Sequence, residues 1–404
     1  MATLSARRRD FLKTLSSVPL VGALFGCGAS APTAAAARNY LAELGVKPII
    51  NGAGVYTMFT GSLMQPEVIE VIQQTSKHFV RLDEMHDRIG EKIAALVGAE
   101  SAMVSSGAFG AMTCGTAACI TAGELEKTLI IPDTRDLKNE AIIQKSHRFA
   151  YDHAVRNCGV TLIEVETRDE LEAAINERTA LMLFLNKGEP NGQIKHEEFV
   201  ELGKKHGVPT MNDCAADVPP VENLTKYNKL GYDLVAFSGG KGICGPQSAG
   251  LLFGRKDLIA AGRKNTFPVS DALGRGLKVN KEEIVAMWVA LDNYLKRDHE
   301  ADWREWESRI ATMSEKVSAV SGVKTEAFIP VIANQVPHLR VSWDAGSVAI
   351  APNEVKQQLR DGDPSIELIP GGYVPDTLEI ASWMLQPGEA EIVGDRITEI
   401  LRSV

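Results

Sequence analysis

Residues 233–254 constrain the fold of this chain more than any other segment. Two apolar runs, Leu234–Phe237 and Ala249–Phe253, flank a glycine-rich connection that carries a single lysine, Lys241. Short apolar runs bounded by glycine predict buried strands, so this lysine lies between two strands of a core. Burial disfavours a bare ammonium, and a lysine at such a position therefore requires a bonded partner.

A Schiff base with an aldehyde cofactor meets this requirement of Lys241. The adjacent glycines, Gly239 and Gly240, are expected to let a flat ring approach the backbone. Ser238, three residues before the lysine, can donate a hydrogen bond to a cofactor phosphate. The alternative from this segment alone is an ordinary solvated surface lysine.

Two other motifs overlap the same segment. Residues 240–245 fit G-x-G-x-x-G, but Pro246 and the following apolar run leave no room for the helix that a dinucleotide site needs. Residues 238–241 fit S-x-x-K, the nucleophile and base of penicillin-recognising serine hydrolases. That pair requires a helix, which Gly239 and Gly240 disfavour. A Ser238/Lys241 hydrolase is the alternative from a different enzyme class.

The order of predicted elements indicates the fold class. The chain has 404 residues, 45% of them hydrophobic, enough for two domains with a sizeable core. Helices are predicted over residues 66–82, 83–97, 107–121 and 281–296. Strands are predicted over 101–105, 128–131, 162–165, 181–185, 208–212, 234–237 and 250–253. Their alternation predicts an α/β fold with a mostly parallel sheet covered by helices on both faces.

The last hundred residues have a different pattern, that of a smaller α+β unit. Strands are predicted near Thr325 and over 338–343 and 378–381, with an amphipathic helix over 388–401. We therefore predict three parts: a leader and linker (1–37), an N-terminal segment with a large domain (38–296), and a small C-terminal domain (297–404).

The N-terminus resembles an export signal. Arg7-Arg8-Arg9 precedes Phe-Leu-Lys, and thirteen uncharged residues follow, too few to span a bilayer comfortably. This pattern predicts twin-arginine export to the periplasm, with cleavage near Ala34–Ala37. A lipid-modified Cys27 is a second option, although Phe25 fits that motif poorly. The alternative is an uncleaved basic, apolar helix.

Charge and cysteine content exclude several classes of function. The net charge is −9 and no basic stretch follows the leader, which argues against a nucleic-acid partner. Five cysteines lie beyond the leader without C-x-x-C spacing or nearby histidine pairs. They predict buried thiols rather than a disulfide framework or a metal site.

Two further segments supply groups that suit an aldehyde cofactor. Ser106-Gly107-Ala108 lies where a strand meets a helix, so its free N–H groups form a phosphate cradle, or Ser106 is an ordinary N-cap. Asp213 follows an apolar strand and can pair with a protonated pyridine nitrogen, or cap a helix. In an open α/β sheet, such strand ends meet at one edge together with Lys241.

These segments resemble fold-type-I pyridoxal-phosphate enzymes and, within them, the group related to bacterial L-seryl-tRNA(Sec) selenium transferase. The resemblance covers residues 45–300 and is weak beyond them. It is carried by Phe237-Ser-Gly-Gly-Lys241, Gly245-Pro-Gln247, Asp213-Cys-Ala-Ala, Asn51-Gly-Ala-Gly54 and Gly274-Arg275.

The departures from that pattern favour a metabolic branch of the group. The transferase has an N-terminal tRNA-binding domain where this chain has its leader. Gly240 stands where the transferase has an acid, and Tyr56-Thr57 replaces a His-Thr pair. The chain looks closer to the branch that includes an ammonia-lyase acting on a phosphorylated amino sugar acid.

The resemblance also implies roles for individual residues. Lys241 would form the Schiff base and then act as the catalytic base. The implied cofactor-binding set comprises Ser106, Gly107, Ala108, His147, Asp213, Ser238 and Lys241. His147 would stack on the ring or touch substrate, or else be a surface histidine. Arg275 and Arg340 are candidates for gripping a substrate carboxylate, or else surface or interface arginines. The group implies at least a homodimer.

The sequence therefore predicts a pyridoxal-phosphate-dependent lyase that acts on an amino acid or amino sugar acid, through ammonia loss or a related β-elimination. A racemase, a side-chain transferase and a non-catalytic amine-binding protein on the same scaffold are the alternatives that keep the cofactor. The substrate is predicted to be a small amine, whose identity the residues leave open.

Overall fold

The computed structural model describes residues 38–404, and the chain divides into two units between Lys47 and Pro48. In the first unit, helix α2 (Tyr40–Glu43) is capped by Asn39, whose side chain accepts from the Ala42 N–H at 3.1 Å. The predicted export signal and Cys27 lie outside the described residues. Among the helices of residues 38–404, none combines the length and the apolar run that crossing a bilayer would take.

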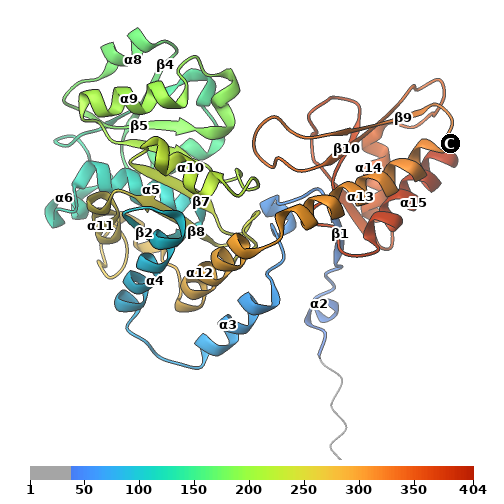
Figure 1. Ribbon diagram of the computed structural model, residues 1–404, viewed down its shortest axis with the longest axis horizontal. Coiled ribbons are helices and arrows are strands. Elements are labelled where there is room, and N and C mark those ends of the chain that lie inside the picture. The colour runs from blue at the N-terminus through green and yellow to red at the C-terminus, as the bar shows by residue number, and fades with distance from the viewer. Residues whose placement is uncertain (1–37) are drawn as a thin grey trace, which may run out of the picture. The chain divides into compact units, whose positions relative to one another are not determined.

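The second unit contains a seven-stranded sheet in the order β2-β8-β7-β6-β5-β3-β4 (Figure 1). Strand β8 runs antiparallel to both of its neighbours, and the other pairs are parallel. The predicted α/β class with a mostly parallel sheet is confirmed. The strands are β2 (Ser101–Ser106), β3 (Glu140–Gln144), β4 (Thr161–Val165), β5 (Thr179–Leu185), β6 (Thr210–Asp213), β7 (Leu234–Ser238) and β8 (Ala249–Gly254).

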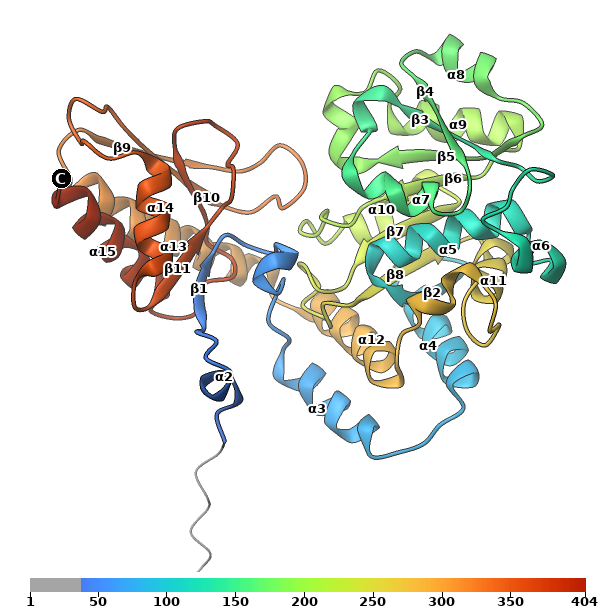
Figure 2. The same cartoon turned by 180° about the vertical axis from the view of Figure 1, so that it is seen from behind.

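Helices cover both faces of this sheet (Figures 1 and 2). Alternate side chains of each strand enter different cores, as Leu183 and Phe184 do in β5. One core is shared with α5 (Gly107–Thr121), α7 (His153–Arg156) and α11 (Lys256–Lys264). The other is shared with α4 (Leu82–Val97), α8 (Arg168–Ala174), α9 (His196–His206), α10 (Asn223–Leu230) and α12 (Lys281–Lys296). Helix α3 (Pro66–Ser76) packs on α12.

The C-terminal residues form an antiparallel sheet of order β12-β10-β9, with β9 (Val323–Phe328), β10 (His338–Trp343) and β12 (Leu378–Ala381). Strand β1 (Ile49–Gly52) pairs in parallel with β11 (Ser365–Leu368). Ile50 is consequently buried with C-terminal residues rather than with the large sheet. Helices α13 (His299–Ser318), α14 (Pro352–Asp361) and α15 (Glu389–Arg402) complete this α+β part.

One predicted strand is absent from the structure, and one observed strand was not predicted. Residues 128–131 were predicted as a buried strand, but they belong to helix α6 (Leu125–Ile130) and its end, where Leu129 is 43% and Ile130 50% exposed. The prediction of a strand was wrong because it treated this apolar run as core. Strand β3 was not predicted, since it begins with the charged Glu140.

Short 3-10 helices are η1 (Thr57–Phe59), η2 (Lys145–His147), η3 (Ala150–Asp152), η4 (Asn186–Asn191) and η5 (Leu273–Leu277).

Candidate active site

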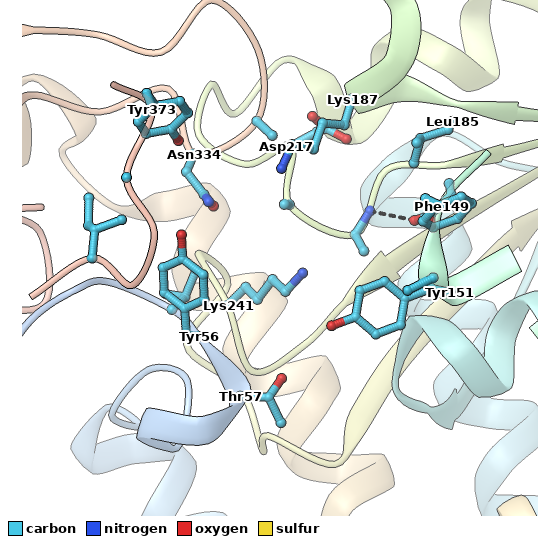
Figure 3. Close-up of a pocket in the computed structure, with 18 residues that line it drawn as sticks. Tyr56, Thr57, Phe149, Tyr151, Leu185, Lys187, Asp217, Lys241, Asn334 and Tyr373 are labelled. Atoms are coloured by element: carbon cyan, nitrogen blue, oxygen red, sulfur yellow. Dashed lines mark hydrogen bonds between the residues drawn. The ribbon is translucent and has the colours of Figure 1, made fainter. Parts of the chain in front are cut away.

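A cavity of about 480 Å³ lies where β5, β6 and β7 end. Leu185 closes β5 and Asp213 closes β6, while Lys241 comes three residues after the end of β7. Because these strands are parallel, their carboxyl ends meet at one edge of the sheet. The lining also includes Val55, Tyr56, Thr57, Phe149, Ala150, Tyr151, Lys187, Ala215, Ala216, Asp217, Ala333, Asn334, Ile369, Gly372 and Tyr373 (Figure 3).

Lys241 lies in a tight turn that follows β7. The Cys244 N–H donates to the Lys241 carbonyl at 2.9 Å, and the Gly245 N–H donates to the Gly239 carbonyl at 2.8 Å. The lysine side chain reaches into the space between Tyr56 and Tyr151 (Figure 3). Residues 239–248 form turns and no helix. The G-x-G-x-x-G and S-x-x-K interpretations both require a helix here, so the structure supports neither of them.

The glycines beside Lys241 are required by contacts within the protein. A Cβ on Gly242 would lie 2.1 Å from the Val218 carbonyl oxygen, and one on Gly240 would lie 2.3 Å from the Gln247 Cα. Both distances are shorter than any van der Waals contact. These glycines allow backbone segments to pack closely, and the expectation that Gly239 and Gly240 also make room for a flat ring stays a prediction.

Asp213 is buried and Lys241 is half-buried, and the structure brings both of these sequence-predicted residues into the cavity. The Asp213 carboxylate is 4% exposed and accepts from the Ala215 N–H at 2.9 Å. Burial raises the pKa of Asp213, and the charge of Lys241 opposes this shift. Burial lowers the pKa of Lys241, while the charge of Asp213 opposes it. The lysine is therefore biased toward the neutral amine that attacks an aldehyde.

Asp217 is a third buried charge in the cavity, which the sequence analysis missed. The residue is 3% exposed, and burial raises its pKa to about 7, although the Asn186 side chain and the charge of Lys241 oppose the shift. Asp217 could have been predicted from its position four residues after Asp213, in the segment that follows β6.

The predicted phosphate cradle lies at the same edge of the sheet. Ser106 ends β2 and is the N-cap position of α5, yet its side chain makes no capping bond. Strand pairing brings Ser105 and Ser238 to opposite sides of Gly250, so Ser238 lies near the start of α5. No atom lies within 4 Å of the Cβ position on Gly107, which leaves open space at the helix N-terminus. These residues do not line the 480 Å³ cavity itself.

Comparison with known proteins agrees with this arrangement. The family model described as L-seryl-tRNA selenium transferase matches residues 50–316, about two thirds of the chain. The chain belongs to this family.

Similar proteins differ in how much of this chain they match. D-glucosaminate-6-phosphate ammonia lyase of Salmonella typhimurium is 28% identical over 90% of this chain and 98% of its own length. A 5'-C-glycyluridine monooxygenase-decarboxylase of a Streptomyces species is 25% identical over 89% of this chain and 91% of its own. The L-seryl-tRNA(Sec) selenium transferase of Carboxydothermus hydrogenoformans is 25% identical, but the match covers 62% of this chain and 56% of the transferase.

Solved structures show the same relationship. The structure of D-glucosaminate-6-phosphate ammonia-lyase superimposes with a TM-score of 0.79 and 26% identity, covering 91% of this chain and 99% of that one. A NifS-like protein, at 15% identity and a TM-score of 0.57, shares the fold alone. The chain thus has the fold of fold-type-I pyridoxal-phosphate enzymes, and the suspected family is confirmed.

The residues of this family member fit pyridoxal phosphate. Lys241 is half-buried with a pKa lowered by burial, and no hydrogen bond or ion pair within residues 38–404 involves its side-chain nitrogen. Asp213 supplies a buried carboxylate in the same cavity. Ser106, whose side chain caps nothing, and the open N-terminus of α5 suit a phosphate. Lys241, Asp213, Ser106, Gly107, Ala108 and Ser238 would hold the cofactor.

His147 does not take the position predicted for it. It is wholly buried, its ring centroid lies 4.4 Å from that of Phe184, and its Nδ1 accepts from the Leu185 N–H at 3.3 Å. Burial lowers its pKa to about 4. The surface interpretation of His147 is therefore wrong, and since His147 does not line the cavity either, its contact with the ring or substrate stays a prediction. Phe149 and Tyr151, from the same segment, line the cavity instead.

The two candidate substrate arginines also lie outside the cavity lining. Arg340, in β10, donates to Glu379 at 2.9 Å and to Glu326 at 2.6 Å, and its guanidinium stacks 4.2 Å from the Phe328 ring centroid. The Arg340 guanidinium is therefore paired with two carboxylates of the protein. The prediction that it binds a substrate carboxylate was wrong. Arg275 is half-buried in η5, and its role stays a prediction.

Proposed function

We propose that this protein is a pyridoxal-phosphate-dependent lyase that releases ammonia from an amino sugar acid or a related amino acid. The observation that carries the proposal is the presence of Lys241 and Asp213 in one cavity at the carboxyl edge of the sheet. The similarity to D-glucosaminate-6-phosphate ammonia lyase supports it, because that similarity extends over 98% of the relative's length.

Bound pyridoxal phosphate supplies an electron sink for the carbon that bears the substrate amine. Lys241 has a pKa lowered by burial, so its free amine is suited to take the proton from that carbon. Asp213 provides the carboxylate for the cofactor's ring nitrogen. Ser238 and the N-terminus of α5 provide donors for its phosphate.

The rest of the cavity suits a hydroxylated substrate. Tyr56 and Thr57 enter from the N-terminal segment, while Asn334 and Tyr373 enter from the C-terminal part (Figure 3). Their hydroxyl and amide groups donate and accept, as the hydroxyl groups of a sugar acid require. The Asn334 side-chain oxygen is buried without a partner in the described residues, so it is available to a ligand.

The test is spectroscopic and chemical. The purified protein with pyridoxal phosphate should show the visible absorption band of a lysine-bound cofactor, and Lys241→Ala should lose it. Amino sugar acids and β-hydroxy amino acids should then be screened for release of ammonia and a 2-oxo acid. No lysine-dependent band, or no ammonia from any substrate, would contradict the proposal. Exchange of the Cα hydrogen with inversion and without ammonia would indicate a racemase.

We also propose that the protein forms at least a homodimer. Large apolar side chains are exposed at Met58, Leu63 and Phe79, the last of them fully. Phe79 also lines a groove of about 430 Å³ with Val80, Leu82 and residues 278–283. Exposed apolar side chains of this size favour burial against another protein surface.

Export by the twin-arginine route is the proposal for residues 1–37. It is supported by Arg7-Arg8-Arg9 and the uncharged stretch that follows. Fractionation of cells that express the full chain should place the protein in the periplasm, and replacing Arg8 and Arg9 by lysine should retain it inside. Metabolic labelling with a fatty acid would reveal a lipid at Cys27.

A further inference from the structure

Asp217 is a buried carboxylate in the cavity that has no role in binding the cofactor. Its backbone N–H donates to the Cys214 carbonyl at 3.1 Å, and its own carbonyl accepts from the Asn223 side chain at 2.7 Å. These bonds fix the main chain, while the side chain remains in the cavity lining. In Figure 3, Asp217 lies beside Lys187 and across the cavity from Lys241.

The placement of Asp217 relative to Lys241 is built into the backbone. Gly242 follows the lysine and packs onto the carbonyl of Val218, which follows the aspartate. The two functional side chains therefore come from adjacent residues of two segments in direct contact. Asp217 and Lys241 also affect each other's pKa, as groups that face the same space do.

Loss of ammonia from a 2-amino-3-hydroxy acid requires a proton at the 3-hydroxyl. The Cα–H bond breaks and its proton moves to Lys241 Nζ. The Cβ–O bond then breaks, and the oxygen keeps the bonding pair, takes a proton and leaves as water. Cβ takes a proton in its place, and water hydrolyses the carbon–nitrogen bond. The net products are ammonia and a 3-deoxy-2-oxo acid, so that atoms balance without an oxidant.

We propose that Asp217 is the general acid that protonates the departing 3-hydroxyl group of a 2-amino-3-hydroxy acid. This inference rests on the proposed lyase function. Asp217 gives its carboxyl proton to the leaving oxygen and regains one from the substrate nitrogen when the imine forms. Lys241 is left free to move the proton between Cα and Cβ.

The electrostatics of the cavity favour Asp217 over the other acids. Burial raises its pKa to about 7, so a substantial fraction carries the proton at neutral pH. Burial raises the pKa of Tyr56 above its ordinary value near 10, which makes this hydroxyl a weaker acid. Tyr151 and Lys187 are exposed. The charged groups that face Asp217 are Asp213, Lys187 and Lys241.

Asp217→Asn tests the inference by separating the two steps. With D-glucosaminate and D-glucosaminate 6-phosphate in deuterated water, the variant should still exchange the Cα hydrogen. Its ammonia release should fall about 100-fold or more, the usual contribution of a general acid. Asp217→Glu should recover part of the activity. The control is Glu189→Gln, a carboxylate-to-amide change in η4, outside the cavity lining, which should leave both rates unchanged.

A second substrate sharpens the result. Chloride leaves without a proton, so Asp217→Asn should release ammonia from β-chloroalanine at close to the wild-type rate. Equal losses of exchange and elimination in Asp217→Asn, or unchanged release of ammonia from the hydroxy acids, would overturn the inference. Failure of the wild type to release ammonia from any of these compounds would instead refute the lyase function.

Discussion

At the scale of single residues, one close backbone contact links two segments of the site. Gly242 lies against the Val218 carbonyl, and a Cβ at residue 242 would approach that oxygen to 2.1 Å. The contact joins the turn that carries Lys241 to the segment that carries Asp213 and Asp217. A glycine next to the lysine is therefore needed for position, and not for an unusual backbone angle, because its φ is not positive.

Gly242→Ala should consequently separate the two segments. We expect the free energy of unfolding to fall by about 1–3 kcal/mol, as overpacking usually costs, and cofactor loading to fall with it. Urea unfolding and the visible band of the lysine-bound cofactor measure the two effects. Gly276→Ala is the matched control, since no atom lies within 4 Å of its Cβ position. Full loading of Gly242→Ala would show that the contact does not position the lysine.

Residue chemistry explains which site residues the sequence could predict. Lys241 and Asp213 were found because a charge at the end of an apolar strand is costly unless it has a function. Asp217 was missed, since it follows small residues in a loop and only the fold shows its burial. Arg340 was misjudged because its partners, Glu326 and Glu379, come from two other strands. Pairing between strands cannot be read from local pattern.

At the scale of elements, the same physical limit applies. Helices α5 and α12, whose apolar faces enter the core, were predicted to the residue, whereas the core strand β3 was missed and the helix predicted over 66–82 ends at Ser76. Helix α6 was missed because apolar periodicity cannot distinguish a core strand from an exposed apolar helix of similar length. Helix α6 and the segment between α3 and α4 both expose large apolar side chains to solvent.

Phe79, in the segment between α3 and α4, provides a test of the proposed homodimer. Phe79→Ser should weaken a dimer by about 1000-fold, since burying a phenylalanine contributes about 2 kcal/mol and twofold symmetry counts it twice. Light scattering across a dilution series measures the change. Ile392→Ser, a partly exposed apolar residue of α15, should leave the association unchanged. Unaltered association of Phe79→Ser would place the interface elsewhere.

At the scale of the whole second unit, the first strand and the C-terminal residues of that unit form one α+β part. Strand β1 pairs with β11, and Ile50 is buried with residues 310–401. Segment 55–57 follows β1 and reaches the cavity, so the C-terminal part and the start of the unit build one wall of the site together. Domain boundaries drawn along the sequence did not anticipate this, because parallel pairing over some 300 residues leaves no local signal.

The stability of the whole molecule should fall in mild acid, and His86 is a main cause. His86 is buried and its Nε2 accepts from the Val104 N–H at 3.0 Å. Burial, followed by the charge of Arg263, lowers its pKa to about 3. Between pH 6.5 and 3 the unfolded chain therefore binds a proton that the folded chain does not, and stability falls as pH falls.

By pH 5 this contribution amounts to about 2 kcal/mol. Asp217 acts in the opposite direction, because its raised pKa favours the folded state below pH 7.

The test therefore compares how much the free energy of unfolding changes between pH 7.5 and pH 5 in each variant. It is measured by urea unfolding of the cofactor-loaded protein. His86→Gln should be less stable at pH 7.5, yet lose about 2 kcal/mol less than the wild type on acidification. His78→Gln, at an exposed histidine, should keep the full loss. An undiminished loss in His86→Gln would assign the acid sensitivity to other groups, of which buried His147 and His196, each with a pKa lowered to about 4, are the next candidates.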